Sequence, residues 1–186
     1  SKELRDVIDR ASNGPRAAAA LTELIRYFRP GDEDDLPDHA VRQGWGIVDV
    51  LARRMLRSGN SSAAAHLAIA EGLMQRGLNA AALLRYRETL REGQNVFEAW
   101  AAVAMLEQRE LERVAEVDPQ EALVMLKRLE TFHSEAMELW KDRPVQPGLP
   151  RAYVTVGESL YDAGDIAGAR TLLEGSLALE PQPRAV

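Results

Sequence analysis

The stretch RAYVTVGESLYDAGDIAGARTLLEGSLALEP, residues 151–181, decides the fold of this chain. Two small residues, Gly157 and Ala169, stand twelve positions apart, and the larger apolar residues Leu160 and Leu173 follow them by three and four positions. Apolar residues at these spacings form one face of an α-helix. The stretch therefore predicts two helices that cross where their side chains are smallest, with larger side chains packed around the crossing.

A second stretch, residues 63–96, repeats this arrangement. Its small positions are Ala70 and Ala82, its large positions are Leu73 and Tyr86, and its turn residue is Gly77. A third unit begins on the same period, because His66 and Trp100 are 34 residues apart, but the interval from Trp100 to Tyr153 is 53 residues. We therefore expect the third hairpin to be elongated.

Helical spacing and the Gly and Pro breaks predict about nine helices, the first around Leu4–Ile8, and no sheet. The sequence divides into N-terminal helices or a degenerate repeat at 1–60, two hairpins at 61–142, and a C-terminal hairpin at 151–186. Residues 143–150 contain three prolines and read as a linker, because proline interrupts a helix.

The pattern resembles the tetratricopeptide repeat family, whose 34-residue unit carries Trp, Leu-Gly, Tyr, Ala, Phe and Pro in this order. The residues that carry the resemblance are Tyr153, Val156, Gly157, Leu160, Gly164, Ala169, Leu173 and Pro181. The resemblance implies an all-α fold, a short right-handed superhelix (solenoid) of helical hairpins. It also implies a concave face, lined by the first helix of each hairpin, that holds peptides or partner helices.

The charge of the chain excludes some partners. The formal net charge is −6, and the acidic excess lies in residues 61–186. Such a surface repels nucleic-acid phosphates and anionic membranes, so neither is an expected partner. No apolar run reaches the roughly 18–20 residues that span a bilayer, and the first residues do not form a signal peptide. We expect a cytoplasmic protein without membrane insertion.

Motifs for catalysis or for metal and cofactor binding are not found in the sequence. The chain has no cysteine, and its three histidines, His39, His66 and His133, are far apart. Glu130 and His133 form half of a carboxylate-bridged di-iron motif, but no second copy exists. A solvated helix face is the alternative interpretation of this pair. We expect no catalytic residue, no metal and no cofactor, and therefore not an enzyme.

The expected function is a scaffold or chaperone-like adaptor that binds a protein or peptide in the concave groove. In the register of the family, the first helices at 63–76, 97–115 and 151–163 line this groove. The side chains expected to face it are Leu67, Glu71, Met74, Met105, Arg109, Val154, Glu158 and Tyr161. They combine acidic and apolar groups, so the partner should carry basic and apolar residues.

Other interpretations stay open at this point. The chain is either a self-sufficient adaptor or a regulatory or oligomerising domain of a larger enzyme whose catalytic part is not in this sequence. The groove is either open, or shallow, or filled by the chain's own N-terminal helix around Leu4–Ile8. No capping helix is evident after Pro181, so the last hairpin should dock either a second copy, giving a homo-oligomer, or a missing segment.

Overall fold

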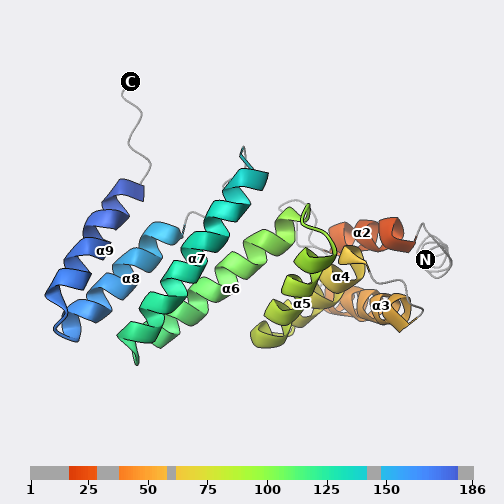
Figure 1. Ribbon diagram of the computed structural model, residues 1–186. Coiled ribbons are helices and arrows are strands. Elements are labelled where there is room, and N and C mark those ends of the chain that lie inside the picture. The colour runs from red at the N-terminus through yellow and green to blue at the C-terminus, as the bar shows by residue number, and fades with distance from the viewer. Residues whose placement is uncertain (1–16, 29–37, 58–61, 142–147, 180–186) are drawn as a thin grey trace, which may run out of the picture. The chain divides into compact units, whose positions relative to one another are not determined.

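Eight α-helices make up the described part of the computed structural model, which comprises residues 17–28, 38–57, 62–141 and 148–179 (Figure 1). They are α2 (Ala17–Phe28), α3 (Asp38–Arg57), α4 (Ala63–Met74), α5 (Asn79–Glu92), α6 (Phe97–Ala115), α7 (Pro119–Leu139), α8 (Leu149–Asp162) and α9 (Ile166–Leu179). No strand occurs in these residues, so the all-α prediction is confirmed. The expected helix around Leu4–Ile8 lies outside the described residues.

The chain divides into two compact units, Ser1–Ala99 (unit 1) and Trp100–Val186 (unit 2). The boundary falls at the beginning of α6, between the two hairpins that the sequence-based division grouped at 61–142. Within unit 1, α4 packs against α2, α3 and α5. Within unit 2, α8 packs against α7 and α9, and the Trp100 ring of α6 lies 4.4 Å from the Phe132 ring of α7, centroid to centroid.

The predicted crossing of small residues is present in the α8–α9 hairpin, and the corresponding residues of the α4–α5 hairpin are buried. A Cβ atom added to Gly157 of α8 would lie 3.0 Å from Cγ of Leu173 and 3.4 Å from the carbonyl oxygen of Ala169, both in α9. In the other hairpin, Ala70 of α4 and Ala82 of α5 are completely buried. The helices therefore approach so closely that larger side chains at these positions would overlap their neighbours.

The two hairpins also share one turn geometry. Gly77 and Gly164 have φ angles of 70° and 86°, in the left-handed region that favours glycine. In each turn, the amide after the glycine donates a hydrogen bond to a carbonyl five residues earlier, at 3.0 Å and 2.9 Å respectively. This Schellman geometry ends the first helix and satisfies its last carbonyls. The second helix of each hairpin therefore begins within two residues of the glycine.

Polar caps fix two other helix starts. The Ser62 hydroxyl accepts a hydrogen bond from the Ala65 amide at 3.2 Å, so Ser62 is the N-cap of α4. The Asp118 carboxylate accepts from the Gln120 and Glu121 amides at 3.1 Å and 3.0 Å. Pro119 follows as the first residue of α7, where its missing amide hydrogen costs no intrahelical bond.

The last hairpin begins two residues earlier than the sequence suggested. The linker was expected to end at Pro150, but α8 begins at Leu149, and Pro150 lies in its first turn. The Leu149 side chain is buried, which draws this turn onto unit 2. Most of the expected linker, residues 142–147, lies outside the described residues. A proline in the first turn of a helix breaks no intrahelical hydrogen bond. The same residue type that ends a helix can therefore also lie at the start of one.

Tyr153 ties α8 to both neighbouring helices of unit 2. Its hydroxyl donates a hydrogen bond to the Glu130 carboxylate of α7. Its ring lies against Gly175 of α9, where an added Cβ would be 3.1 Å from the ring. Burial and, secondarily, the bond to Glu130 raise the pKa of Tyr153 to about 12. The hydroxyl therefore remains protonated, and the hydrogen bond persists, at any physiological pH.

His66 is a buried polar side chain in α4 of unit 1. Burial, and then the positive charge of Arg85, lower its pKa below the usual 6.5, against the opposing effects of Glu88 and Glu92. Its Nδ1 atom has no hydrogen-bond partner among the described residues. The folded protein therefore favours the neutral imidazole, because protonation would place a charge in an apolar environment.

We predict that Gly157→Leu and Ala169→Leu each lower the free energy of unfolding by about 1–3 kcal/mol, because either side chain overpacks the α8–α9 crossing. Thermal and urea unfolding followed by circular dichroism measures the change. Ala167→Leu, at an exposed position of α9, is the matched control and should have little effect. Equal stabilities for all three variants would contradict the crossing.

We also predict that the free energy of unfolding decreases as the pH falls below His66's usual pKa of 6.5. Below this pH the unfolded chain binds a proton at His66 that the folded chain binds less readily. The contribution of neutral His66 to the free energy of unfolding is therefore complete above pH 6.5 and is lost as the pH falls toward the lower pKa of the folded state. Urea unfolding at about pH 7.5 and about pH 5.5 measures it. His66→Phe should make the dependence shallower; an unchanged dependence would contradict the prediction.

Candidate functional site

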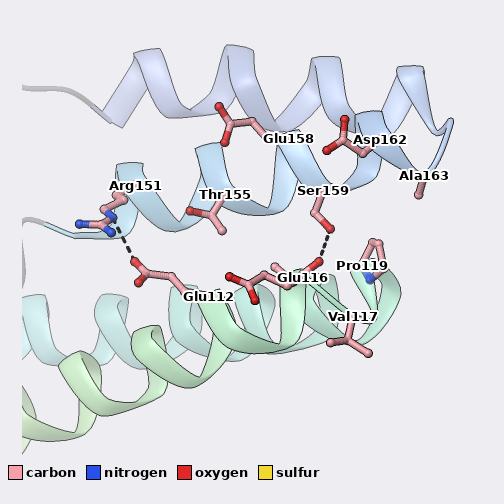
Figure 2. Close-up of a pocket in the computed structure, with 11 residues that line it drawn as sticks. Glu112, Glu116, Val117, Pro119, Arg151, Thr155, Glu158, Ser159, Asp162 and Ala163 are labelled. Carbon is pink, nitrogen blue, oxygen red and sulfur yellow. Dashed lines mark hydrogen bonds and ion pairs between the residues drawn. The ribbon is translucent and has the colours of Figure 1, made fainter.

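A groove of about 540 Å³ lies within unit 2, between the C-terminal end of α6 and one face of α8 (Figure 2). The residues that line it are Glu112, Ala115, Glu116, Val117, Pro119, Arg151, Thr155, Glu158, Ser159, Asp162 and Ala163. Charged groups dominate this lining. The groove is the natural candidate for a functional site in the described residues, because concave surfaces are where proteins usually bind ligands.

Two contacts set the direction of the helices that form the groove. The Arg151 Nε atom lies 3.1 Å from Oε1 of Glu112, and the Ser159 hydroxyl donates a hydrogen bond to the carbonyl oxygen of Ala115. Later residues of α6 thus meet later residues of α8, so the two helices run in the same direction. Figure 2 shows the Arg151–Glu112 pair at one end of the groove and Pro119 with Ala163 at the other.

The Arg151 end is anchored by a short chain of polar contacts. The Gln108 amide nitrogen donates to Oε1 of Glu112 at 3.0 Å, the same oxygen that pairs with Arg151. The Gln108 side chain is buried and lies directly against Gly148, where an added Cβ would overlap its amide. Gln108 therefore lies between Glu112 and the start of α8 at this end of the groove.

The lining of the groove is acidic, and its other end contains the ends of both helices. Four carboxylates, those of Glu112, Glu116, Glu158 and Asp162, and one guanidinium give the lining a formal charge of −3. Glu116 directly follows α6, and Asp162 is the last residue of α8. The C-terminal end of a helix carries partial negative charge, so each such carboxylate costs about 0.3–1 kcal/mol. The acids stand where helix stability disfavours them.

Apolar surface lies beside these acids. Val117 is 82% exposed, although valine usually lies inside a protein. Pro119 and Ala163 line the same end of the groove. The groove therefore combines an acidic lining with a small apolar patch at one end, and the Arg151–Glu112 ion pair lies at the opposite end.

The structure places the eight predicted site residues in different environments. Leu67 and Glu71 are buried, with 7% and 6% of their surface exposed, so they offer no open binding surface in unit 1. Met74, Met105 and Val154 are half-buried, Arg109 and Glu158 are exposed, and Tyr161 is 59% exposed. Of the eight, only Glu158 lines the groove. Whether the others contact a partner stays a prediction.

Sequence reasoning missed most of the groove because α8 lies beside the end of α6 and not beside its middle. Met105 and Arg109 were chosen from the regular 34-residue register. The residues of α6 that face α8 are instead the last ones before its end at Ala115. The 53-residue interval was the available signal of this shift. A second signal was the equal i, i+4 spacing of two acid pairs, Glu112 with Glu116 and Glu158 with Asp162.

Metal chemistry and membrane insertion find no support in the described helices. Residues 17–28, 38–57, 62–141 and 148–179 hold no cluster of three or more His, Cys, Asp or Glu side chains placed to bind a metal ion. None of the helices in these ranges combines the length and the apolar character needed to cross a bilayer.

Comparison of the chain with protein-family models finds no match, and comparison with curated proteins finds none either.

We predict that Ser159→Ala lowers the free energy of unfolding by about 0.5–1.5 kcal/mol, because it removes the hydrogen bond that joins α8 to the end of α6. Urea unfolding of the intact chain, followed by tryptophan fluorescence, measures the change. Ser134→Ala is the matched control, because the Ser134 hydroxyl bonds to a carbonyl of its own helix, that of Glu130. If both variants were equally stable, the contact between α6 and α8 would contribute nothing.

Proposed function

We propose that this chain is a protein-binding adaptor of the tetratricopeptide type and that the groove between α6 and α8 holds a segment of its partner. The observation that carries the proposal is the groove itself, with acidic and small apolar side chains on two parallel helices. The repeated crossings and the shared glycine turns support the family assignment. A right-handed solenoid is part of this proposal.

The contacts of α8 explain why a groove exists on this side of the helix. Gly157 and Tyr153 turn toward α9 and α7, whereas Arg151 and Ser159 reach α6 near its end. The small side chain of Thr155 lies between Arg151 and Ser159 along α8 and lines the groove. The helices are thus joined at two points with a small side chain between them, and a narrow segment fits there better than a bulky domain surface.

The charge of the lining favours a polypeptide partner over a nucleic acid or an anionic lipid. A lining with formal charge −3 repels phosphate groups. Aromatic side chains, which usually dominate small-molecule pockets, do not occur in this lining. An extended or helical segment can instead supply both the cation and the apolar side chain that the groove accommodates.

The test is a peptide-display selection against the intact chain, repeated with a variant whose groove is filled. Thr155→Tyr places a ring in the groove, and Thr171→Tyr adds the same ring at an exposed position of α9. We predict that selected peptides bind at least about tenfold more weakly to Thr155→Tyr, a loss of about 1.4 kcal/mol, and bind Thr171→Tyr as tightly as the parent.

Fluorescence anisotropy gives the dissociation constants, and circular dichroism confirms that both variants are folded. Selected peptides that bind the two variants equally well would place the binding surface elsewhere. A selection that enriches no peptide would contradict the proposed function altogether.

A further inference from the structure

The hairpin of α8 and α9 carries an exposed apolar surface, the hairpin face, formed by five side chains. On α9, Ile166 and Leu177 are 56% and 68% exposed, and Leu173 between them is half-buried. On α8, Tyr161 is 59% exposed and Val154 is half-buried. Intervals of four and seven separate these residues, so each set lies on one side of its helix. Exposed apolar surface that gathers in this way usually marks an interaction site.

Two contacts define the register between α8 and α9. The Tyr153 ring lies against Gly175. Four residues later in α8, Gly157 lies against both Ala169 and Leu173, and the midpoint of these two is four residues before Gly175. Both contacts therefore describe one antiparallel register, in which each residue forward along α8 corresponds to one residue back along α9.

Two opposite charges border the hairpin face at the same level. In this register Glu158 is level with Arg170. Each directly follows a residue of the crossing, Gly157 or Ala169, and successive residues lie about 100° apart around a helix. Because the helices are antiparallel, this step turns both side chains to the same face of the hairpin, at its two outer edges. Both residues are exposed, and Figure 2 shows the Glu158 side chain on the side of α8 away from α6.

A second copy of the chain matches this face when the two-fold axis runs parallel to the helices. This axis lays α8 of each copy over α9 of the other and leaves every residue at its own level. Glu158 of each copy then meets Arg170 of the other, so both edges carry an ion pair. The apolar pairs that meet between these edges are Tyr161 with Ile166 and Val154 with Leu173. Charged and apolar groups of the face are thus complementary to themselves.

We propose that two copies of this chain associate through the hairpin face, with α8 of each copy packed on α9 of the other. The other two-fold axis in this face runs across the helices. It would stack α8 on α8 and keep Glu158 of one copy away from Arg170 of the other, so it leaves these charges unpaired. A two-fold contact also closes on itself, and association therefore ends at the dimer.

Two charges on the same chain oppose this contact and are exceeded. Arg170 already pairs with Glu174 at 2.7 Å, but the two side chains are 78% and 63% exposed, and such pairs are weak. A guanidinium group has donors for a second carboxylate as well. The formal net charge of −6 repels a second copy, but at about 0.15 M salt this repulsion is screened beyond about 8 Å, whereas the contacts of the face are direct.

The experiment is sedimentation equilibrium of the intact chain at about 0.15 M salt, over a wide range of protein concentrations. We expect a monomer–dimer equilibrium without larger species. Glu158→Arg and Arg170→Glu should each weaken dimerisation at least about tenfold, because each places like charges opposite each other twice. The double variant Glu158→Arg/Arg170→Glu exchanges the two charges and should dimerise within about threefold of the parent.

The matched control is Glu135→Arg, which makes the same charge change at an exposed position of α7 and should leave dimerisation unchanged. Leu177→Asn tests the apolar part of the face without altering charge, and it should weaken dimerisation at least about threefold. Circular dichroism checks that each variant is folded, and both Leu177 and Glu158 are exposed, so neither substitution disturbs the core.

A chain that stays monomeric at every concentration would overturn the inference. So would equal weakening by Glu135→Arg and Glu158→Arg, or dimerisation that Leu177→Asn leaves unchanged. If the double variant dimerised no better than the single ones, α8 would not lie on α9 of the other copy. Species that keep growing with concentration would show a contact that does not close, which also contradicts the two-fold arrangement.

Discussion

The close approach of two helices at a pair of small side chains is the contact on which both regular hairpins depend. Gly157 lies against α9 so closely that even a methyl group would press on Leu173. Ala70 and Ala82 are buried in the same way in unit 1. Small residues at the crossing let larger apolar side chains close around it, and the hydrophobic surface buried there is the main source of stability.

The groove is a consequence of how α8 is held. Gly157 faces α9, Tyr153 reaches Glu130 of α7, and Ser159 reaches the end of α6. These contacts fix the helix on three sides. The remaining surface, with Glu158 and Asp162, needs no internal partner for the fold to form. Its charges are therefore free to serve recognition, at a modest expense in helix stability.

The hairpins could be predicted from the sequence because their determinants are local. The crossing of the last hairpin is formed by Gly157 and Ala169, and its turn by Gly164, all within one repeat of the sequence. Helical spacing also shows which residues face inward. The environment of α4 was harder to predict. Leu67 and Glu71 were assigned to an open face, but every residue from Ala65 to Leu73 is buried. A helix with so few charges is usually surrounded on all sides, here by α2, α3 and α5.

The groove could not be predicted in full because it depends on the position at which α8 meets α6. This position does not follow from periodicity. Glu112 and Glu116 resemble any solvated acids of a helix until Arg151 and Ser159 are placed beside them. Glu158 was identified because it belongs to the regular repeat, whereas its neighbours across the groove belong to the irregular one.

The tight turn at Gly164 has a consequence for the order in which the chain assembles. Its left-handed conformation joins α8 and α9 with three residues between them, so the two helices meet with little loss of loop-closure entropy. Four residues join α4 and α5 in a similar way around Gly77. Contacts of low sequence separation form early in folding. We therefore expect these two hairpins to be the nuclei of their units, and the groove to appear only when α8 docks on α6.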